Sequence, residues 1–277
     1  MSAAAAEDLE LLEIELLLEA VHRHYAFDFR DYAPSSLRRR LWRRAAAEGV
    51  GTLSALQERV LHDPACMERL LLDLSVTTTS MFRDPPFWLA FRERVVPVLR
   101  THPFLRIWVA GCSTGEEAYS MAILLDEEGL LERARIYATD VNATVLARAR
   151  EGVFGLGRMR EAEAGYERAG GAHALSDYYA EGYDSARLRR SLSRSVVWAQ
   201  HNLVSDSSFN EFHVVLCRNV LIYFAKPLQD RVHALLHASL APFGVLALGA
   251  RESLRFTAFE AGYEPVDDGE RLYRRRA

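Results

Sequence analysis

Residues 105–119, LRIWVAGCSTGEEAY, combine a glycine turn with two adjacent carboxylates. Gly111 and Gly115 bracket the turn, but it lacks the middle glycine that lets a dinucleotide's pyrophosphate approach the backbone. Glu116 and Glu117 then begin a helix, at the end where the dipole and the free N–H groups attract anions. Their charge would repel a phosphate and suit a cation, although acidic residues in a first helical turn also simply complement the dipole.

Asp140 closes the next apolar run, ARIYATD, and is therefore expected at the end of a strand. An acid at this position commonly receives the two hydroxyls of a ribose. Its alternative role is to cap the next helix, which Asn142 can also do. Together with the acidic turn, Asp140 indicates a nucleoside ligand that is cationic and has no phosphates. S-adenosylmethionine matches that description better than NAD or ATP.

Apolar runs that alternate with helical segments from Leu105 onward predict the elements that position these residues. Strands are expected at LRIWVA, ARIYATD, SVVWAQ, HVVLCRNVLIYF and GVLALGA, with helices over 116–126, 142–150 and 227–240. The series predicts an α/β fold with a mostly parallel, doubly wound sheet, whose ligands lie beyond the carboxyl ends of the strands. Residues 152–194 are too long for an ordinary loop and are expected to form an inserted subdomain.

Residues 1–75 are expected to form a small all-helical domain. An amphipathic helix over 7–25 would carry one apolar face, made by Leu9, Leu12, Leu16, Leu17 and Val21. A second helix should be capped by Ser35 or Ser36 and end at Gly49, and two more follow at 53–61 and 64–74. The second helix should pack through Leu37, Leu41, Trp42 and Ala45 and present a cationic face of Arg39, Arg40, Arg43 and Arg44.

Composition narrows the class of protein. A chain of 277 residues with 49% hydrophobic content can bury a full core. No apolar run reaches the roughly 20 residues of a membrane helix, and the start MSAAAAEDLE lacks the features of a secretory signal. Three cysteines without CxxC spacing favour a reducing cytoplasm, and a net charge of -4 argues against a dedicated nucleic-acid binder. No metal site is expected, because His233 and His237 have no third ligand nearby.

Six motifs in order make the chain resemble the chemotaxis receptor methyltransferases of the CheR family: SSLRRRLWRR, TTTSMFRDP, GCSTGEEAYS, ATDVNATVLARAR, AQHNL and CRNVLIYF. The resemblance spans nearly the whole chain, from about Leu9 to Tyr273. It implies an S-adenosylmethionine-dependent protein-glutamate O-methyltransferase with a class I methyltransferase (Rossmann-like) fold. It also implies a helical receptor-docking domain (1–75), a linker that contributes to the cofactor site (76–104), and a methyltransferase domain (105–277) with a small β-subdomain inserted at about 152–194.

The same resemblance assigns contacts with the cofactor. Arg83 would pair with the cofactor carboxylate, Glu116 would lie near its amino group, and Asp140 would hold the ribose. Thr77 stands where the family usually has asparagine, so the paired donor and acceptor of an amide are lost there. The full implied set is Thr77, Thr79, Arg83, Gly111, Gly115, Glu116, Asp140, the adenine-side pair Asn202 and Leu203, and the strand-end pair Arg218 and Asn219.

Arg218, Asn219 and Tyr223 lie, by the same resemblance, at the mouth through which the substrate arrives, and they receive orienting roles. No general base is needed, because a glutamate with a reference pKa of about 4.3 is already an anionic nucleophile at neutral pH. Methyl transfer from a sulfonium is an in-line displacement in which positioning is the main task. The second product would be S-adenosylhomocysteine.

Family receptors present methylatable glutamates on acidic helical bundles, so the resemblance implies that Arg39, Arg40, Arg43 and Arg44 dock there. The alternative is a solvated face in an arginine-rich chain. The enzyme is expected to be a cytoplasmic monomer with no nucleic-acid partner and no membrane insertion. Two other functions stay open: a methyltransferase for a small molecule or RNA, and a non-catalytic S-adenosylmethionine-binding scaffold. Whether the inserted subdomain binds a receptor C-terminal peptide also stays open.

Overall fold

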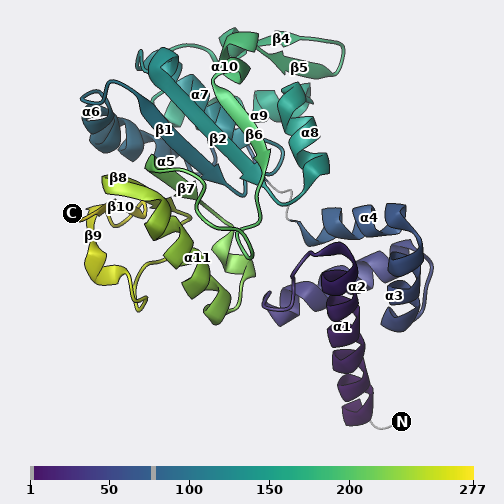
Figure 1. The fold of residues 1–277 in the computed structure, drawn as a ribbon. Coiled ribbons are helices and arrows are strands. Elements are labelled where there is room, and N and C mark those ends of the chain that lie inside the picture. Colours follow the sequence, from purple (N-terminus) through teal and green to yellow (C-terminus); the bar gives the residue numbers. More distant parts are fainter. Residues whose placement is uncertain (1–2, 76–78) are drawn as a thin grey trace. The chain divides into compact units, whose positions relative to one another are not determined.

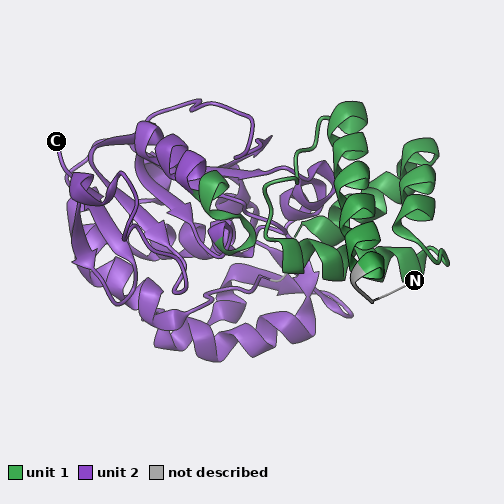
Figure 2. Ribbon diagram, turned by 90° about the horizontal axis from the view of Figure 1, so that it is seen from below, with its two compact units in different colours: residues 1–76, 222–229 green, residues 77–221, 230–277 purple. Residues whose placement is uncertain are grey.

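The protein is described by a computed structural model that covers residues 3–75 and 79–277 (Figure 1). Thr77, one of the expected cofactor contacts, lies outside the described residues. Contacts divide the chain into two compact units (Figure 2). The first comprises residues 1–76 and 222–229, and the second comprises residues 77–221 and 230–277. Contacts thus group a short segment from the distant part of the chain with the N-terminal helices.

Four helices form the first unit: α1 (Ala3–Tyr25), α2 (Pro34–Ala47), α3 (Leu53–His62) and α4 (Pro64–Leu74). The side chains of Thr52 and Asp63 cap α3 and α4 by accepting from the backbone N–H groups of Ala55 and Ala65. The expectation of a serine cap on α2 is wrong. This helix begins at Pro34, whose missing N–H and fixed φ suit a first helical position, so both serines lie inside it.

The apolar residues of α1 are divided between two faces. Leu17, Leu18 and Val21 are buried, as expected for a packing face. Leu9, Leu12 and Leu16 are instead 46%, 50% and 51% exposed. Of the five predicted apolar positions, only Leu17 and Val21 join the core of the helical unit, so the predicted apolar face is only partly buried.

On α2, Leu37, Leu41 and Ala45 are buried as expected, but Trp42 is exposed and donates from Nε1 to Glu10. Arg40 is also buried, so its placement on an exposed cationic face is wrong. Its guanidinium donates to the carbonyl of Leu74 at 2.6 Å and lies 4.8 Å from the centroid of the Tyr223 ring. Burial without a carboxylate lowers the pKa of Arg40.

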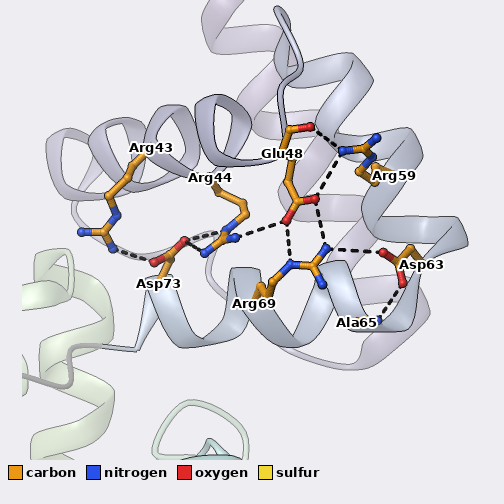
Figure 3. A network of polar contacts seen from close by, with 8 residues as sticks. All are labelled: Arg43, Arg44, Glu48, Arg59, Asp63, Ala65, Arg69 and Asp73. Atoms are coloured by element: carbon orange, nitrogen blue, oxygen red, sulfur yellow. Dashed lines mark hydrogen bonds and ion pairs between the residues drawn. The ribbon is translucent and has the colours of Figure 1, made fainter.

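Arg44 is turned inward as well, into a network of ion pairs (Figure 3). Asp73 forms ion pairs with Arg43 at 2.9 Å and with Arg44 at 2.5 Å. Glu48 forms ion pairs with Arg44 at 3.2 Å and with Arg69 at 2.7 Å, and its backbone carbonyl accepts a hydrogen bond from Arg59. The expected cationic face is thus smaller than predicted. Arg44 forms ion pairs within the unit, and only 14% of its side chain is exposed.

A seven-stranded sheet organises the second unit in the order β6-β2-β1-β7-β8-β10-β9. Its strands are β1 (Leu105–Ala110), β2 (Ala134–Asp140), β6 (Val196–Gln200), β7 (Phe212–Cys217), β8 (Leu240–Leu248), β9 (Tyr263–Asp267) and β10 (Leu272–Arg275). The first five strands in this order are parallel to one another, and β10 runs antiparallel to both of its neighbours, β8 and β9. The predicted mostly parallel, doubly wound sheet is confirmed, with its strand order reversing between β1 and β7.

The helices of the second unit are α5 (Pro85–Ala90), α6 (Val96–Leu99), α7 (Glu116–Glu127), α8 (Ala143–Glu151), α9 (Leu156–Arg168), α10 (Arg190–Arg194) and α11 (Lys226–Ser239), of which α11 begins in the first unit. The predicted helices at 116–126 and 142–150 match α7 and α8 to within a residue. Asn142 is the cap of α8, accepting from Thr144 and Val145. The predicted long strand HVVLCRNVLIYF is wrong beyond Cys217, because Leu221–Tyr223 forms a 3-10 turn.

The inserted segment contains a separate antiparallel sheet of β3 (Val153–Gly155), β5 (Ser185–Leu188) and β4 (Tyr179–Glu181). It also contains α9, a thirteen-residue helix that the sequence did not lead us to expect. Glu127 at the end of α7 anchors this segment, because it accepts from the hydroxyls of Tyr166 and Tyr178 and pairs with Arg92. In the described part of the chain, no helix is long and apolar enough to cross a membrane.

The ion pairs of Glu48 should make the stability of the fold depend on pH. The arginine partners lower the pKa of Glu48 to about 2 from an ordinary 4.5. A lowered carboxyl pKa stabilises the fold above the unfolded value, and this contribution is lost as the pH falls through the folded value. We expect Glu48→Gln to cost about 1–2 kcal/mol near neutral pH, after allowance for solvent screening.

That cost should shrink between about pH 4.5 and about pH 2. Urea unfolding of the full chain at several pH values measures this cost. Hydrogen exchange in peptides from α2–α4 serves as the readout for the helical unit. Glu58→Gln on α3 is the matched control, because Glu58 is exposed. A Glu48→Gln cost that stayed constant down to the lowest pH would contradict the prediction.

Candidate functional site

The candidate site lies at the carboxyl edge of the large sheet, where β1, β2, β6 and β7 all end. Parallel strands bring the residues that follow them to the same edge, and the crevice opens where the strand order reverses. The turn after β1, Asp140 at the end of β2 and Arg218 after β7 therefore meet there. The backbone N–H of His201, after β6, donates to the carbonyl of Asp140 at 3.1 Å and joins a fourth strand end.

Both glycines of the turn after β1 are required by close packing. Gly111 has a φ of +71°, and a Cβ there would lie 2.6 Å from Val220 Cγ2. Gly115 has a φ of +96°, and its Cβ would lie 2.9 Å from Trp198 Cη2. Ser113 between them also has a positive φ, of 50°. The turn is thus shaped by its neighbours in the protein, whether or not a ligand approaches it.

Asp140 fixes this turn to the end of β2. Its Oδ2 accepts from the backbone N–H of Ser113 at 2.9 Å, and its Oδ1 accepts from that of Asn142 at 3.0 Å. Burial raises the pKa of Asp140, while these hydrogen bonds to the charged form oppose the rise. Because Asn142 caps α8, Asp140 is not required as the cap. Each of its oxygens keeps a lone pair for a further donor.

Glu116 and Glu117 have different surroundings. Glu116 is 2% exposed; its Oε2 accepts from Thr114 Oγ1 at 2.6 Å, and its Oε1 lies 3.1 Å from Arg158 Nη2. Burial raises the pKa of Glu116. Glu117 pairs with Arg218 at 2.7 Å, and burial raises its pKa against the pull of that arginine. Glu117 therefore pairs with a buried arginine, whereas Glu116 pairs with the exposed Arg158 and lines a cavity.

That cavity has a volume of about 260 Å³ and belongs entirely to the second unit. One wall is the stretch of residues 80–85, which includes Arg83, and the other is α9, which contributes Arg158 and Met159. Glu116 adds an acidic group to the lining. Arg158 also donates to the carbonyl of Thr79 at 2.6 Å, so it links the two walls. The cavity thus brings together two of the predicted site residues, Arg83 and Glu116.

Arg218 is held by carboxylates on two sides. Its Nη1 contacts Glu117 at 2.7 Å and its Nη2 contacts Asp84 at 2.9 Å. Its guanidinium carbon lies 3.8 Å from the centroid of the Phe87 ring, and its side chain is only 1% exposed. A buried cation must be paired, and here two carboxylates offset its charge.

The remaining predicted residues are more dispersed. Asn202 forms a tight turn after β6, in which its Oδ1 accepts from Val204 N–H at 2.9 Å, and Leu203 lies half-buried within it. Tyr223 belongs to the first unit, where its carbonyl accepts from Ala33 N–H at 2.9 Å. Its expected grouping with Arg218 and Asn219 stays a prediction.

One buried polar atom at the edge is free to meet a ligand. Ser113 is 6% exposed, and its Oγ has no hydrogen-bond partner among the residues that the structure describes. It lies in the turn that Asp140 fixes. Buried hydroxyls are normally satisfied, so this atom is suited to a polar group of a bound molecule.

Sequence reasoning missed Glu252, which joins the ends of β7 and β8. This carboxylate is 4% exposed and accepts from the backbone N–H groups of Gly249 at 2.6 Å, Asn219 at 3.0 Å and Val220 at 2.8 Å. It thereby holds Asn219 at a φ of 60°. Its one sequence signal is an acid soon after the apolar run GVLALGA. Arg158 was missed because nothing distinguishes it among many arginines.

We expect Glu252→Ala to destabilise the protein by about 2–3 kcal/mol, because one buried and two partly buried N–H groups would lose their acceptor. The urea unfolding midpoint of the ligand-free chain measures this loss. Glu211→Ala is the matched control, since that carboxylate is 60% exposed and lies 3.7 Å from Arg106. Its effect should stay within about 0.5 kcal/mol. Equal effects of the two substitutions would contradict the role given to Glu252.

Comparison with protein families matches both parts of the chain. Residues 77–263 match the S-adenosylmethionine-binding domain of the CheR methyltransferases. Residues 12–75 match the all-alpha domain of the same family. The matched ranges cover the turn after β1, Asp140 and Arg218 in the first case and α2 to α4 in the second.

Relatives agree with this match. The Pseudomonas putida protein Cher3, named provisionally as a methyltransferase, is 49% identical over 95% of this chain and 97% of its own length. Chemotaxis protein methyltransferase 1 of Pseudomonas aeruginosa is 30% identical over 92% of each chain. An uncharacterised 104.1 kDa protein of Rhodobacter capsulatus is 31% identical over 82% of this chain, which spans 24% of that relative. The chain therefore belongs to the CheR methyltransferase family and is an S-adenosylmethionine-dependent methyltransferase.

Proposed function

We propose that this enzyme transfers the methyl group of S-adenosylmethionine to glutamate side chains of methyl-accepting chemotaxis receptors. The products are glutamate methyl esters and S-adenosylhomocysteine. The observation that carries the proposal is the acidic carboxyl edge within a CheR fold, where Glu116 and Asp140 disfavour phosphates and suit a cationic nucleoside. Relatives along most of the chain are named chemotaxis protein methyltransferases, which supports a receptor as the acceptor.

The residues at the edge fit the cofactor. Asp140 keeps lone pairs for the ribose hydroxyls, Glu116 offers a carboxylate to the ammonium group, and Arg83 lines the same cavity as a partner for the carboxylate. Ser113 adds an unsatisfied hydroxyl. The remaining proposed contacts are the backbone at Gly111 and Gly115, the linker residues Thr77 and Thr79, and the polar and apolar sides of the adenine pocket at Asn202 and Leu203.

When bound, the cofactor supplies an activated methyl group, and the protein must only position the acceptor. The glutamate is already ionised at neutral pH, so no residue acts as a general base. A strong unpaired cation beside it would stabilise the reactant anion more than the transition state, in which that charge diminishes. Arg218 avoids this because Glu117 and Asp84 offset its charge. We therefore assign Arg218, Asn219 and Tyr223 orienting roles.

Receptor docking falls to the helical unit, through the exposed cations of α2. Arg39 and Arg43 are exposed, whereas Arg40 and Arg44 are used inside the unit. Arg43 contacts only the edge of the network, at Asp73. Arg39 and Arg43 are accordingly the proposed contacts with an acidic helical bundle, and Arg40 and Arg44 hold the helix that presents them. The enzyme acts in this proposal as a cytoplasmic monomer, with residues 76–104 as linker and residues 105–277 as the catalytic domain.

Substitutions of the two adjacent glutamates should differ in effect, one on cofactor affinity and the other on stability. We expect Glu116→Gln and Asp140→Asn each to weaken S-adenosylmethionine binding about tenfold or more, which is about 1.4 kcal/mol. Glu117→Gln should leave the affinity within about threefold but lower the unfolding midpoint, because Arg218 loses a charge partner. Isothermal titration calorimetry and urea unfolding measure the two effects. A larger loss of affinity in Glu117→Gln than in Glu116→Gln would reverse the assignment.

The docking assignment is tested by charge reversal. At low salt, the double variant Arg39→Glu/Arg43→Glu should transfer labelled methyl groups to receptor cytoplasmic fragments at least about tenfold more slowly, with unchanged cofactor affinity. Arg23→Glu/Arg276→Glu alters two other exposed arginines by the same net charge and is the control. If both double variants slowed transfer equally, a specific docking face on α2 would be ruled out.

A further inference from the structure

Helix α1 carries a second apolar face that its own unit does not cover. Leu9, Leu12 and Leu16 are each about half exposed, at 46%, 50% and 51%. Their spacing of i, i+3 and i+7 places them in one row along the helix, which we call the leucine stripe. Leu17, Leu18 and Val21 are buried on the opposite side. The N-terminal half of α1 extends beyond the other helices of its unit (Figure 1).

The leucine stripe is not an isolated exposed residue of the kind that most surfaces carry. Thirteen large hydrophobic side chains are exposed in the described part of the chain, and four of them lie on α1 between residues 9 and 16. Contiguous exposed apolar patches mark interaction sites in soluble proteins. The i, i+3, i+7 spacing is also the one by which an amphipathic helix contacts a partner helix or groove. The family's all-alpha domain begins at residue 12, so the stripe starts before the matched region.

The charge around the stripe indicates what would cover it. Residues 3–19 contain six acidic residues and no lysine or arginine: Glu7, Asp8, Glu10, Glu13, Glu15 and Glu19. Glu10, Glu13 and Glu19 are engaged by neighbours within the unit. Glu7, Asp8 and Glu15 are exposed and form no ion pair with any described residue. Asp8 lies four residues before Leu12 and Glu15 three after it, so both flank the stripe.

We propose that the leucine stripe docks a basic amphipathic helix of a partner protein, with an apolar row against the leucines and lysine or arginine beside Asp8 and Glu15. This binding surface is separate from the site of methyl transfer. A second copy of this chain would bring like charges together, and an anionic membrane surface would be repelled for the same reason. An acidic receptor bundle suits the arginines of α2 and is excluded at α1. The helical unit thus offers two surfaces of opposite charge to two partners.

The test uses the full-length protein and two designed, labelled helical peptides. Both carry the same leucine row, flanked by lysine in one peptide and by glutamate in the other. Fluorescence anisotropy at low salt should show the lysine peptide binding at least tenfold more tightly. Leu12→Gln/Leu16→Gln should weaken it at least tenfold, while Leu89→Gln, at another exposed leucine, should not. Glutamine keeps helix propensity, and the buried face of α1 is unchanged.

Charge reversal makes the outcome sharper. In Asp8→Lys/Glu15→Lys the preference should invert, so that the glutamate peptide binds more tightly. Equal binding of the two peptides, or no binding of either, would overturn the proposal. So would a dimer of the native protein, seen by sedimentation velocity, that Leu12→Gln/Leu16→Gln dissociates, because the stripe would then be covered by a second copy. Methyl transfer should stay unchanged in all these variants, so the result is independent of the proposed function.

Discussion

The hydrogen bonds of Asp140 organise the functional edge of this protein. One carboxylate oxygen holds the turn after β1 through Ser113 N–H, and the other holds the start of α8 through Asn142 N–H. This places a partly buried carboxylate at the same sheet edge as the turn that leads to the buried Glu116, where the strand order reverses. Two carboxylates at one sheet edge attract a cationic ligand and repel a phosphate. The class of ligand follows from that constraint, and a phosphate does not meet it.

Carboxylates offset the charge of two inward-facing arginines, whereas the buried Arg40 is held by a backbone carbonyl instead. Arg218 is held by Glu117 and Asp84, and Arg44 by Asp73 and Glu48. At the edge of the sheet this pairing offsets the charge of Arg218, for which we propose a role in orienting the substrate carboxylate. That arrangement suits a reaction in which the nucleophile is anionic from the start and loses charge as the bond forms. In the helical unit it determines which arginines remain available to a partner.

Local patterns were enough to place most of the elements. The apolar runs before Gly111 and Asp140 gave strands at the predicted residues, because a strand and the turn that ends it depend on nearby residues. Tertiary contacts could not be predicted from these local patterns. Helical periodicity predicted which residues share a face, but it could not show that Arg40 turns inward to the carbonyl of Leu74 or that Leu12 stays half exposed. The pairing of Glu252 with the strand ends likewise joins residues far apart in the sequence.

The central claim is that the methyl group goes to a carboxylate oxygen of a glutamate. Mass spectrometry of receptor cytoplasmic fragments, after incubation with this enzyme and cofactor carrying an isotopically labelled methyl group, tests it directly. We expect label on glutamate side chains, released as methanol by mild alkali because an ester hydrolyses. Label that resists alkali, or that resides on a nitrogen atom, would contradict it.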